Sequence, residues 1–513
     1  MTRQGAQTAD GKRWWRRIGW PVWVAIVVGG LCVALGAALW LEMRHAYAQA
    51  RWLTRHAQAL TWEVTQGPVP PGERRHPSHG PYNERLGYVD LPAYLEQLQQ
   101  RGYAVARQAR WSEAARAHVD RGWYMPYDEK NQAGLTVLDC RREPMYAFRY
   151  PYRQYEGFEA IPPRVVQALL FIENRGLLDA DRPHMNPAVD WVRFTRAVLG
   201  QLGRLVHDDI DAPGGSTLAT QIEKYRHSPE GRTQDAAEKL RQMISASVRA
   251  YRDGADTLPV RRRLVLDYLN TVPLAAAPRH GEVHGLGDGL WVWFGLDWDD
   301  SNARLRQPVA ADPQERQAQA QALRHVVALM IAHRRPSWFL GRGPGREALA
   351  RLTDAHLRLM ADAGLIEPAL RDAALGQPLR FRDFTQQPAW SPQLPSKGTA
   401  AVRTRLATQL GISLYTLDRL DLDVHTTLHR ELQDAASDYL LRLTDADFAR
   451  RQQLLGERLL RADTLGQVHY SLTLLEATPQ GNLVRLQTDT TGQPLDINEG
   501  SKLELGSTAK LRV

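Results

Sequence analysis

One long apolar stretch near the N-terminus constrains the fold of this chain more than any other feature. Residues 18–41, IGWPVWVAIVVGGLCVALGAALWL, contain no charged side chain. A helix needs about 20 predominantly apolar residues to cross the hydrocarbon core of a bilayer, so this stretch predicts a transmembrane helix. A cleaved signal peptide is the alternative, but its apolar region normally spans only about 7 to 15 residues.

Basic residues on the N-terminal side predict the orientation of this helix. Lys12, Arg13, Arg16 and Arg17 all precede it. Because positive charge is retained in the cytoplasm, the N-terminus is expected inside and everything after residue 42 outside. The sequence therefore predicts a single-span membrane protein that faces outward.

Length and charge limit the remaining possibilities. A chain of 513 residues exceeds what one hydrophobic core usually serves, so roughly two to four structural units are expected. A formal charge of +8 favours an anionic partner, which could be nucleic acid, an acidic membrane face or a phosphorylated substrate. The chain lacks zinc-finger, basic-zipper and aromatic RNA-binding signatures, which argues against nucleic acid. With only Cys32 and Cys140, no internal disulfide framework is implied.

Hydrophobic periodicity predicts a mainly α protein with small α+β regions before and after the main domain. Apolar positions recur three and four residues apart from residue 161 to about residue 378, as in RRRLVLDYLN. The flanking segments predict helices at 43–66 and 91–100, a strand at 103–107, a strand over 421–428, a helix through about 460, and a hairpin over 470–488. Pro- and Gly-rich composition predicts linkers at 67–81 and 386–398.

The segment GGSTLATQIEK, residues 214–224, combines two glycines, two hydroxyls and a lysine. Glycines allow close approach of a ligand, while Ser216 or Thr217 can cap a helix whose first N–H groups face an anion. Gln221 and Lys224 would lie on nearby faces of that helix. The segment therefore suggests a phosphate site, although an ordinary helix start is the commoner origin of such a pattern.

Other polar residues stand at the ends or on the faces of predicted helices. Glu173 follows an apolar helix and precedes Asn174 and Arg175. A carboxylate presented from an apolar face can act as a general base, but a solvated helix-end glutamate is the alternative. The segment EKLRQM places three further polar side chains within about one turn: Lys239, Arg241 and Gln242.

The order of these segments resembles one family, the peptidoglycan glycosyltransferase domain (glycosyltransferase family 51) of class A penicillin-binding proteins. That family shows an ED pair, a GGSTITQQ loop and helix with a lysine, an RKxxE helix, YLN and YFG. This chain offers EN, GGSTLATQIEK, EKLRQ, YLN and WFG in the same order. The resemblance runs from about residue 126 to the end, and it implies a lysozyme-like, mainly α domain in a bacterial inner membrane protein.

The resemblance implies a reaction and a site. The family joins lipid II units, with lipid II and the growing glycan as partners, and releases undecaprenyl pyrophosphate with inversion. Glu173 matches the base, and Gln242 matches most simply the second glutamate of the family. The positions implied to bind substrate are Asn174, Arg175, Ser216, Thr217, Gln221, Lys224, Lys239, Arg241 and Asn270. The membrane and other cell-wall synthesis and division proteins are further implied partners.

Two departures from the family pattern weaken the expected site. Asn174 replaces the aspartate of ED, and Gln242 replaces a glutamate, so negative charge that could bind a divalent cation is missing. No cofactor is firmly expected, and Mg²⁺ or Mn²⁺ remains open. His280 and His284 in HGEVH do not have the order of a zinc motif, and the glycines beside them argue against a helix, so no metal ligands are expected.

Two further segments, one inside the helical region and one at the C-terminus, have recognisable patterns. Residues 190–206 repeat apolar positions at helical spacing with interleaved arginines, which is typical either of a core helix or of an amphipathic segment at the membrane surface. The C-terminal LELGSTAKLRV resembles the start of a penicillin-binding transpeptidase domain, with Ser507 as nucleophile and Lys510 as its partner. Because the other transpeptidase motifs are not encoded, no acyl transfer is expected from this sequence.

The expected organisation is a series of six segments. They are a cytoplasmic tail (1–17), a transmembrane helix (18–41), a membrane-proximal region and linker (42–125), a glycosyltransferase domain (126–385), a linker region (386–466) and the incomplete start of a transpeptidase domain (467–513). Two other functions stay open: a catalytically weak or inactive scaffold of the cell-wall machinery, and a hydrolase that cleaves glycan strands.

Overall fold

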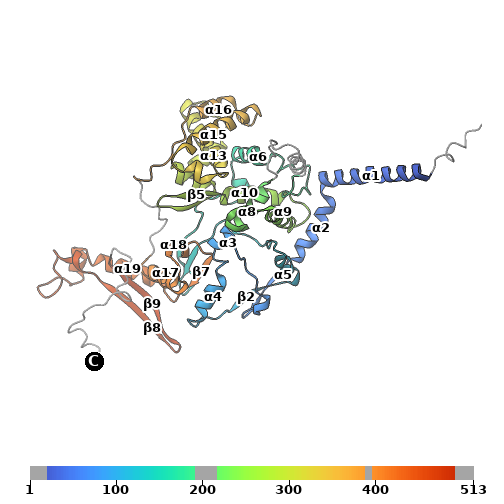
Figure 1. Cartoon of the computed structure of the whole chain (residues 1–513). Helices are drawn as coiled ribbons and strands as arrows, with labels where there is room; N and C mark the ends of the chain where they lie inside the picture. The colour runs from blue at the N-terminus through green and yellow to red at the C-terminus, as the bar shows by residue number, and fades with distance from the viewer. Residues whose placement is uncertain (1–19, 191–215, 387–395, 492–513) are drawn as a thin grey trace, which may run out of the picture.

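The computed structural model describes residues 20–190, 216–386 and 396–491 (Figure 1). The expected cytoplasmic tail, most of the 190–206 segment, Gly214, Gly215, Ser507 and Lys510 lie outside these ranges.

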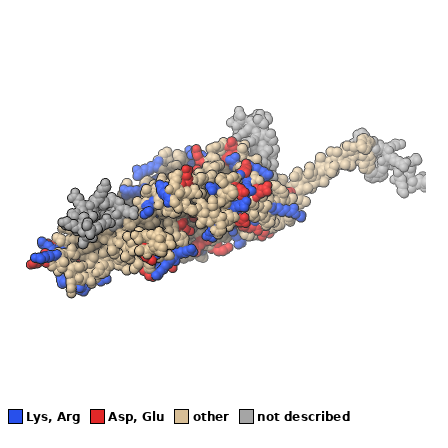
Figure 2. Space-filling model, turned by 90° about the horizontal axis from the view of Figure 1, so that it is seen from below, with Lys and Arg blue, Asp and Glu red and all other residues tan. Residues whose placement is uncertain are grey.

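Helix α1, Trp20–His45, stands out from the body of the protein as a long rod (Figure 1). Its part from Trp23 to His45 is long and apolar enough to cross a membrane. Large apolar side chains such as Leu31 and Val33 are exposed along it, and Figure 2 shows almost no charge over most of its length. The helix predicted at 18–41 is thus present, and exposed apolar surface on this scale suits a bilayer.

A small α+β unit follows α1. Its elements are α2 (Tyr47–Ala59), β1 (Trp62–Gln66), η2 (Pro71–Glu73), α3 (Pro81–Arg85), α4 (Leu91–Gln99), β2 (Arg107–Trp111) and α5 (Glu113–Asp120). The helix predicted at 91–100 is confirmed as α4. The helix predicted at 43–66 is wrong after Ala59, because the segment WEVTQ, rich in aromatic and β-branched residues, pairs antiparallel with β2. The strand predicted at 103–107 lies later, as β2 itself.

The central body is helical, as the periodicity predicts. Its elements are η3 (Phe158–Ala160), α6 (Pro163–Glu173), α8 (Leu218–His227), η4 (Pro229–Gly231), α9 (Ala236–Ala250), α10 (Leu258–Thr271), α11 (Gly285–Gly289), η5 (Leu290–Phe294), α12 (Trp298–Arg306), α13 (Pro313–Ala332), α14 (Pro336–Leu340), α15 (Pro344–Asp362) and α16 (Pro368–Leu375). These helices surround one large hydrophobic core. The chain is therefore mainly α, with small sheets at its edges.

Helix α13 lies at the centre of this core. From Ala320 to Ala332 most of its side chains are buried, and it contacts α6, α12, α15 and α16. A helix that is apolar on all sides is stable only inside a protein. Its C-terminal end therefore occupies a fixed position, next to α6 and the start of α14.

A short hairpin follows α10 and turns the chain back over the core. It consists of β5 (Pro273–Ala277) and β6 (Gly281–His284). Gly285 then adopts a φ of +77°, and a Cβ atom there would lie 2.4 Å from the carbonyl oxygen of Asn270. Only glycine fits at this position. It lets the start of the glycine-rich stretch pack directly against the backbone of the YLN segment.

The C-terminal part packs against a segment from the N-terminal half of the chain. Its elements are α17 (Lys397–Leu410), α18 (Leu414–Leu417), β7 (Leu422–His425), α19 (Arg430–Arg442), α20 (Ala446–Arg451), η6 (Leu465–Gln467), β8 (Ser471–Thr478) and β9 (Gly481–Asp489). Strand β7 pairs parallel with β3 (Leu135–Leu138), which also pairs antiparallel with β4 (Pro144–Ala147). The hairpin predicted over 470–488 is confirmed as β8 and β9. Within the region expected as linker, the strand predicted over 421–428 is confirmed as β7. The helix predicted through about 460 is wrong in its extent, because it is divided into α19 and α20 and ends at Arg451.

Candidate active site

Glu173 is the last residue of α6 and the centre of a polar cluster inside the helical body. Only 8% of its side chain is exposed. Its Oε2 accepts a hydrogen bond of 2.7 Å from Nε2 of Gln221, on α8. The guanidinium of Arg334 lies 3.7 Å from its Oε1, and Nε2 of His333 lies 4.0 Å from the same atom. A buried carboxylate held by an amide next to the end of α13 is a candidate proton acceptor.

Helix α8 begins as the sequence predicts. Thr217 is its N-cap, with Oγ1 accepting from the backbone N–H of Thr220 over 3.3 Å, while Thr220 Oγ1 accepts in return from the N–H of Thr217 over 2.9 Å. Gln221 and Lys224 follow one and two turns later on this helix. The capped end places the first N–H groups of α8 beside the residues that follow Glu173.

Two lysines belong to this region: Lys239 is held at the start of α8, and Lys224 lies two turns further along the helix. Nζ of Lys239, on α9, donates to Oγ of Ser216 over 2.8 Å. Burial and, to a smaller extent, the charge of Lys224 lower the pKa of Lys239 to about 8. Burial also lowers the pKa of Lys224, while the carboxylate of Glu173 opposes this shift. Two partly buried cations that repel each other are arranged as an anion would require.

A cavity of about 600 Å³ lies beside the cluster. Its lining includes Asn174, Arg175 and Thr217 together with Trp40 and Arg44 from the end of α1. The cavity thus connects the expected membrane helix with the capped end of α8. Asn174 and Arg175 line this cavity, and Arg175 also stacks its guanidinium 4.0 Å from the ring centre of Phe171.

Three predicted site residues are not brought to Glu173. Gln242 is fully buried, and its Nε2 donates to Ser228 Oγ (2.9 Å) and Thr233 Oγ1 (3.0 Å). Arg241 pairs with Glu238 at 2.6 Å. Asn270 is used structurally, because its amide exchanges two hydrogen bonds with the backbone of Tyr155, 2.9 and 2.8 Å long. In the described part of the chain these three side chains stabilise the fold around the site.

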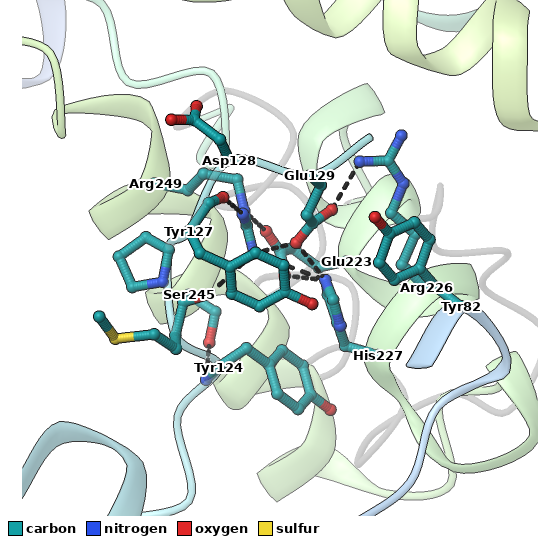
Figure 3. A network of polar contacts seen from close by, with 12 residues as sticks. Tyr82, Tyr124, Tyr127, Asp128, Glu129, Glu223, Arg226, His227, Ser245 and Arg249 are labelled. Atoms are coloured by element: carbon teal, nitrogen blue, oxygen red, sulfur yellow. Dashed lines mark hydrogen bonds and ion pairs between the residues drawn. The ribbon is translucent and has the colours of Figure 1, made fainter. Parts of the chain in front are cut away.

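The C-terminal end of α8 is fixed by a buried ionic network (Figure 3). Glu129 pairs with Arg226 at 2.6 Å, with His227 at 2.7 Å and with Arg249 at 2.7 Å. Arg249 also pairs with Glu223 at 2.6 Å. Burial disfavours a charged Glu129, but the surrounding cations hold its pKa well below the ordinary value. The network anchors α8, and with it Gln221 and Lys224, to the segment before β3.

Three residues near Glu173 were not predicted as site residues from the sequence. His333 and Arg334 follow α13, and Tyr268, in the YLN segment, packs its ring edge against His333 with 5.5 Å between ring centres. The only local signal was HRRP at the end of a long apolar helix. Such a signal is ambiguous, since basic residues are common at helix C-termini.

The residues around Glu173 do not fit a metal ion. Within the ranges that the structure describes, no three His, Cys, Asp or Glu side chains are grouped as metal ligands. Among the described residues, an amide and two basic side chains approach the carboxylate, and these are not the oxygen ligands that Mg²⁺ and Mn²⁺ prefer. His280 precedes strand β6 and His284 is its last residue, so the two do not share a helix face, and His284 Nδ1 lies 2.8 Å from the Tyr150 hydroxyl.

Comparison with known proteins adds one finding. Residues 141–331 match a family model described as Transglycosylase. The match includes Glu173, the capped start of α8, both lysines and most of α13, and it ends just before His333. No curated protein matches the chain.

Proposed function

We propose that the transglycosylase domain of this chain, a family 51 peptidoglycan glycosyltransferase domain at residues 141–331, polymerises lipid II into glycan strands. One observation carries the proposal: a buried carboxylate, Glu173, contacts α8, which carries the partly buried Lys224 and whose capped start is held by the partly buried Lys239. A reaction that removes a proton and expels a diphosphate needs a base and cationic side chains close enough to contact the bound substrates at the same time.

Glu173 would act as the general base. Its carboxylate would accept the proton of the attacking sugar hydroxyl as the new glycosidic bond forms. The hydrogen bond from Gln221 to one carboxylate oxygen limits the rotation of the Glu173 carboxylate. A single displacement of this kind inverts the configuration at the anomeric carbon.

Lys224, Lys239 and Ser216 would bind the diphosphate of the lipid-linked sugar. Charge-assisted hydrogen bonds from two ammonium groups stabilise the negative charge that develops on the leaving oxygen. The first N–H groups of α8 add positive potential at the same place. Since an anion favours the charged form of both lysines, substrate binding would also relieve their mutual repulsion.

The cavity beside α1 would admit the lipid part of the substrate. Its lining combines Trp40 and Arg44 with Asn174 and Thr217, so it joins the expected membrane surface to the diphosphate site. The orientation with the N-terminus in the cytoplasm and the domain outside is part of this proposal, supported by the basic residues before α1.

Polymerisation of lipid II by the purified full chain in detergent tests the function. The expected result is glycan product, with one undecaprenyl pyrophosphate released for each glycosidic bond formed. Absence of product, with or without Mg²⁺ or Mn²⁺, contradicts it.

A non-catalytic scaffold is the second candidate, and one observation favours it. Gln242 is fully buried as a neutral amide satisfied by Ser228 and Thr233, so this position supplies no second carboxylate. A scaffold would bind lipid II without turning it over, which the polymerisation assay and a binding measurement on the same sample separate. Hydrolysis of glycan strands fits less well, because a glycan strand carries no diphosphate for the two lysines; digestion of purified sacculi tests it.

A further inference from the structure

His333 lies between two hydrogen-bond acceptors. Its Nδ1 is 2.8 Å from the carbonyl oxygen of Met330, and its Nε2 is 3.0 Å from Oε1 of Gln221. A neutral imidazole carries one N–H and can satisfy only one of these oxygens, whereas an imidazolium donates to both. The surroundings of the ring therefore favour the protonated form through hydrogen bonds.

The orientation of Gln221 depends on the state of Glu173. An ionised Glu173 can only accept, so the Gln221 amide turns its NH₂ group to the carboxylate, over 2.7 Å. The amide oxygen then faces His333. The ionised base and the protonated histidine are thus mutually compatible across one amide.

The opposite state is also consistent. A protonated Glu173 can donate to the oxygen of an inverted Gln221 amide, whose NH₂ group then donates to Nε2 of a neutral His333. In both states every contact pairs a donor with an acceptor, and in both the three side chains share a single proton. A state without this proton leaves two acceptors face to face, either at Gln221 or at the Met330 carbonyl.

Charged and titratable groups from three helices, together with the neighbouring Arg334, surround His333. They are Glu173 from α6, Lys224 from α8, Tyr268 from α10 and the adjacent Arg334. Burial lowers the pKa of His333, Glu173 opposes this shift, and Arg334 and Lys224 reinforce it. The pKa of His333 therefore depends on the negative charge of the neighbouring carboxylate.

We propose that His333 is a positioning residue for the Glu173 base, and that the two side chains hold one proton jointly through the amide of Gln221. While His333 carries the proton, Glu173 is ionised and fixed by Gln221. The catalytic consequence rests on the proposed function, but the coupling itself does not.

Exchange of the imidazole C2 hydrogen for deuterium, followed by peptide mass spectrometry across pH, measures the coupling without activity. The sample is the full chain in detergent. We expect the titration midpoint of His333 to fall by about one unit or more in Glu173→Gln and in Gln221→Leu. His325 on the same helix is the internal control, because its Nδ1 faces the Gln321 carbonyl at 2.7 Å and its ring packs on Phe294.

Two outcomes overturn the coupling. An unchanged His333 midpoint in Glu173→Gln shows that the two groups titrate independently. A shift in Glu173→Gln without one in Gln221→Leu shows that the effect acts through space and not through the amide.

Kinetics test the positioning role. In His333→Leu we expect kcat to fall at least tenfold with KM within about twofold, and the acidic limb of the rate profile to move to higher pH. His333→Gln should recover part of kcat, since its amide can still donate to Gln221. Equal losses in both variants with an unmoved pH profile overturn the role. If the wild-type protein makes no product, the proposed function fails, and the exchange measurement still decides the coupling.

Discussion

Nζ of Lys239 donates to Oγ of Ser216 over 2.8 Å, which ties α9 to the residue that precedes the cap of α8. The contact leaves an ammonium group, rather than a neutral side chain, at a helix start that already favours anions. It also brings Lys239 close enough to Lys224 for the charge of Lys224 to lower the pKa of Lys239. The site is therefore strained electrostatically until an anion binds.

The first prediction concerns the pH dependence of anion binding. Burial lowers the pKa of Lys239 to about 8, so the side chain loses its charge as the pH rises through that value. The affinity for inorganic pyrophosphate should then fall, towards tenfold per pH unit above it, and binding near it should take up protons. Calorimetry in two buffers of different ionisation enthalpy measures both effects.

Lys239→Arg is the matched variant, because arginine stays charged at any accessible pH. It should keep its affinity on the alkaline side, while Lys239→Met should bind weakly throughout. The same pH dependence in wild-type protein and Lys239→Arg would show that another group controls binding.

A second prediction concerns the base. Glu173→Gln removes the proton acceptor with little change in volume, so polymerisation should fall by about 10²-fold or more. The rate of lipid II turnover is the measurement, with Glu159→Gln, an exposed carboxylate on η3, as the control. More than about a tenth of the wild-type rate would exclude Glu173 as the essential base.

Lys224→Ala gives the third prediction. If Lys224 contacts the diphosphate, turnover of lipid II should collapse while circular dichroism stays unchanged, because the side chain is only partly buried. Lys130→Ala is a suitable control, since Lys130 pairs with Asp421 at the surface. Unchanged kinetics in Lys224→Ala would reduce the capped segment to an ordinary helix start.

The sequence predicts local features of this protein well. The apolar stretch of α1, the periodicity of the helical body and the Thr217 cap depend on neighbouring residues, and each is present. The pairing of β7 with β3 was not predicted, because it joins segments nearly three hundred residues apart, and no local pattern encodes a partner strand.

In the candidate site, too, the features encoded by local sequence were predicted, whereas those that depend on tertiary packing were not. Motif order located Glu173, Gln221 and Lys224, which the structure places in one cluster. It also assigned Gln242 to the site, but a position on a helix does not reveal which side the residue faces, and this amide is buried against Ser228 and Thr233. His333 was missed because it meets Gln221 only through tertiary packing, 112 residues along the chain.

The last prediction concerns the network that anchors α8. Glu129→Gln removes the common partner of Arg226, His227 and Arg249, all largely buried, so the free energy of unfolding should fall by about 3–5 kcal/mol. Asp128→Asn is the neighbouring control: Asp128 is 82% exposed and pairs with Arg252, and its loss should cost less than about 1 kcal/mol. Urea unfolding of the full chain in detergent, followed by tryptophan fluorescence, measures both.

The sign of the pH dependence follows from the same network. The cations hold the pKa of Glu129 well below its ordinary value of 4.5, so its stabilising contribution is complete above that pH and is lost as the pH falls below it. Wild-type protein and Asp128→Asn should therefore both lose stability on acidification over this window, while Glu129→Gln, already destabilised, should lose much less. Parallel acid profiles for wild-type protein and Glu129→Gln would mean that other carboxylates govern acid unfolding and that Glu129 does not anchor α8.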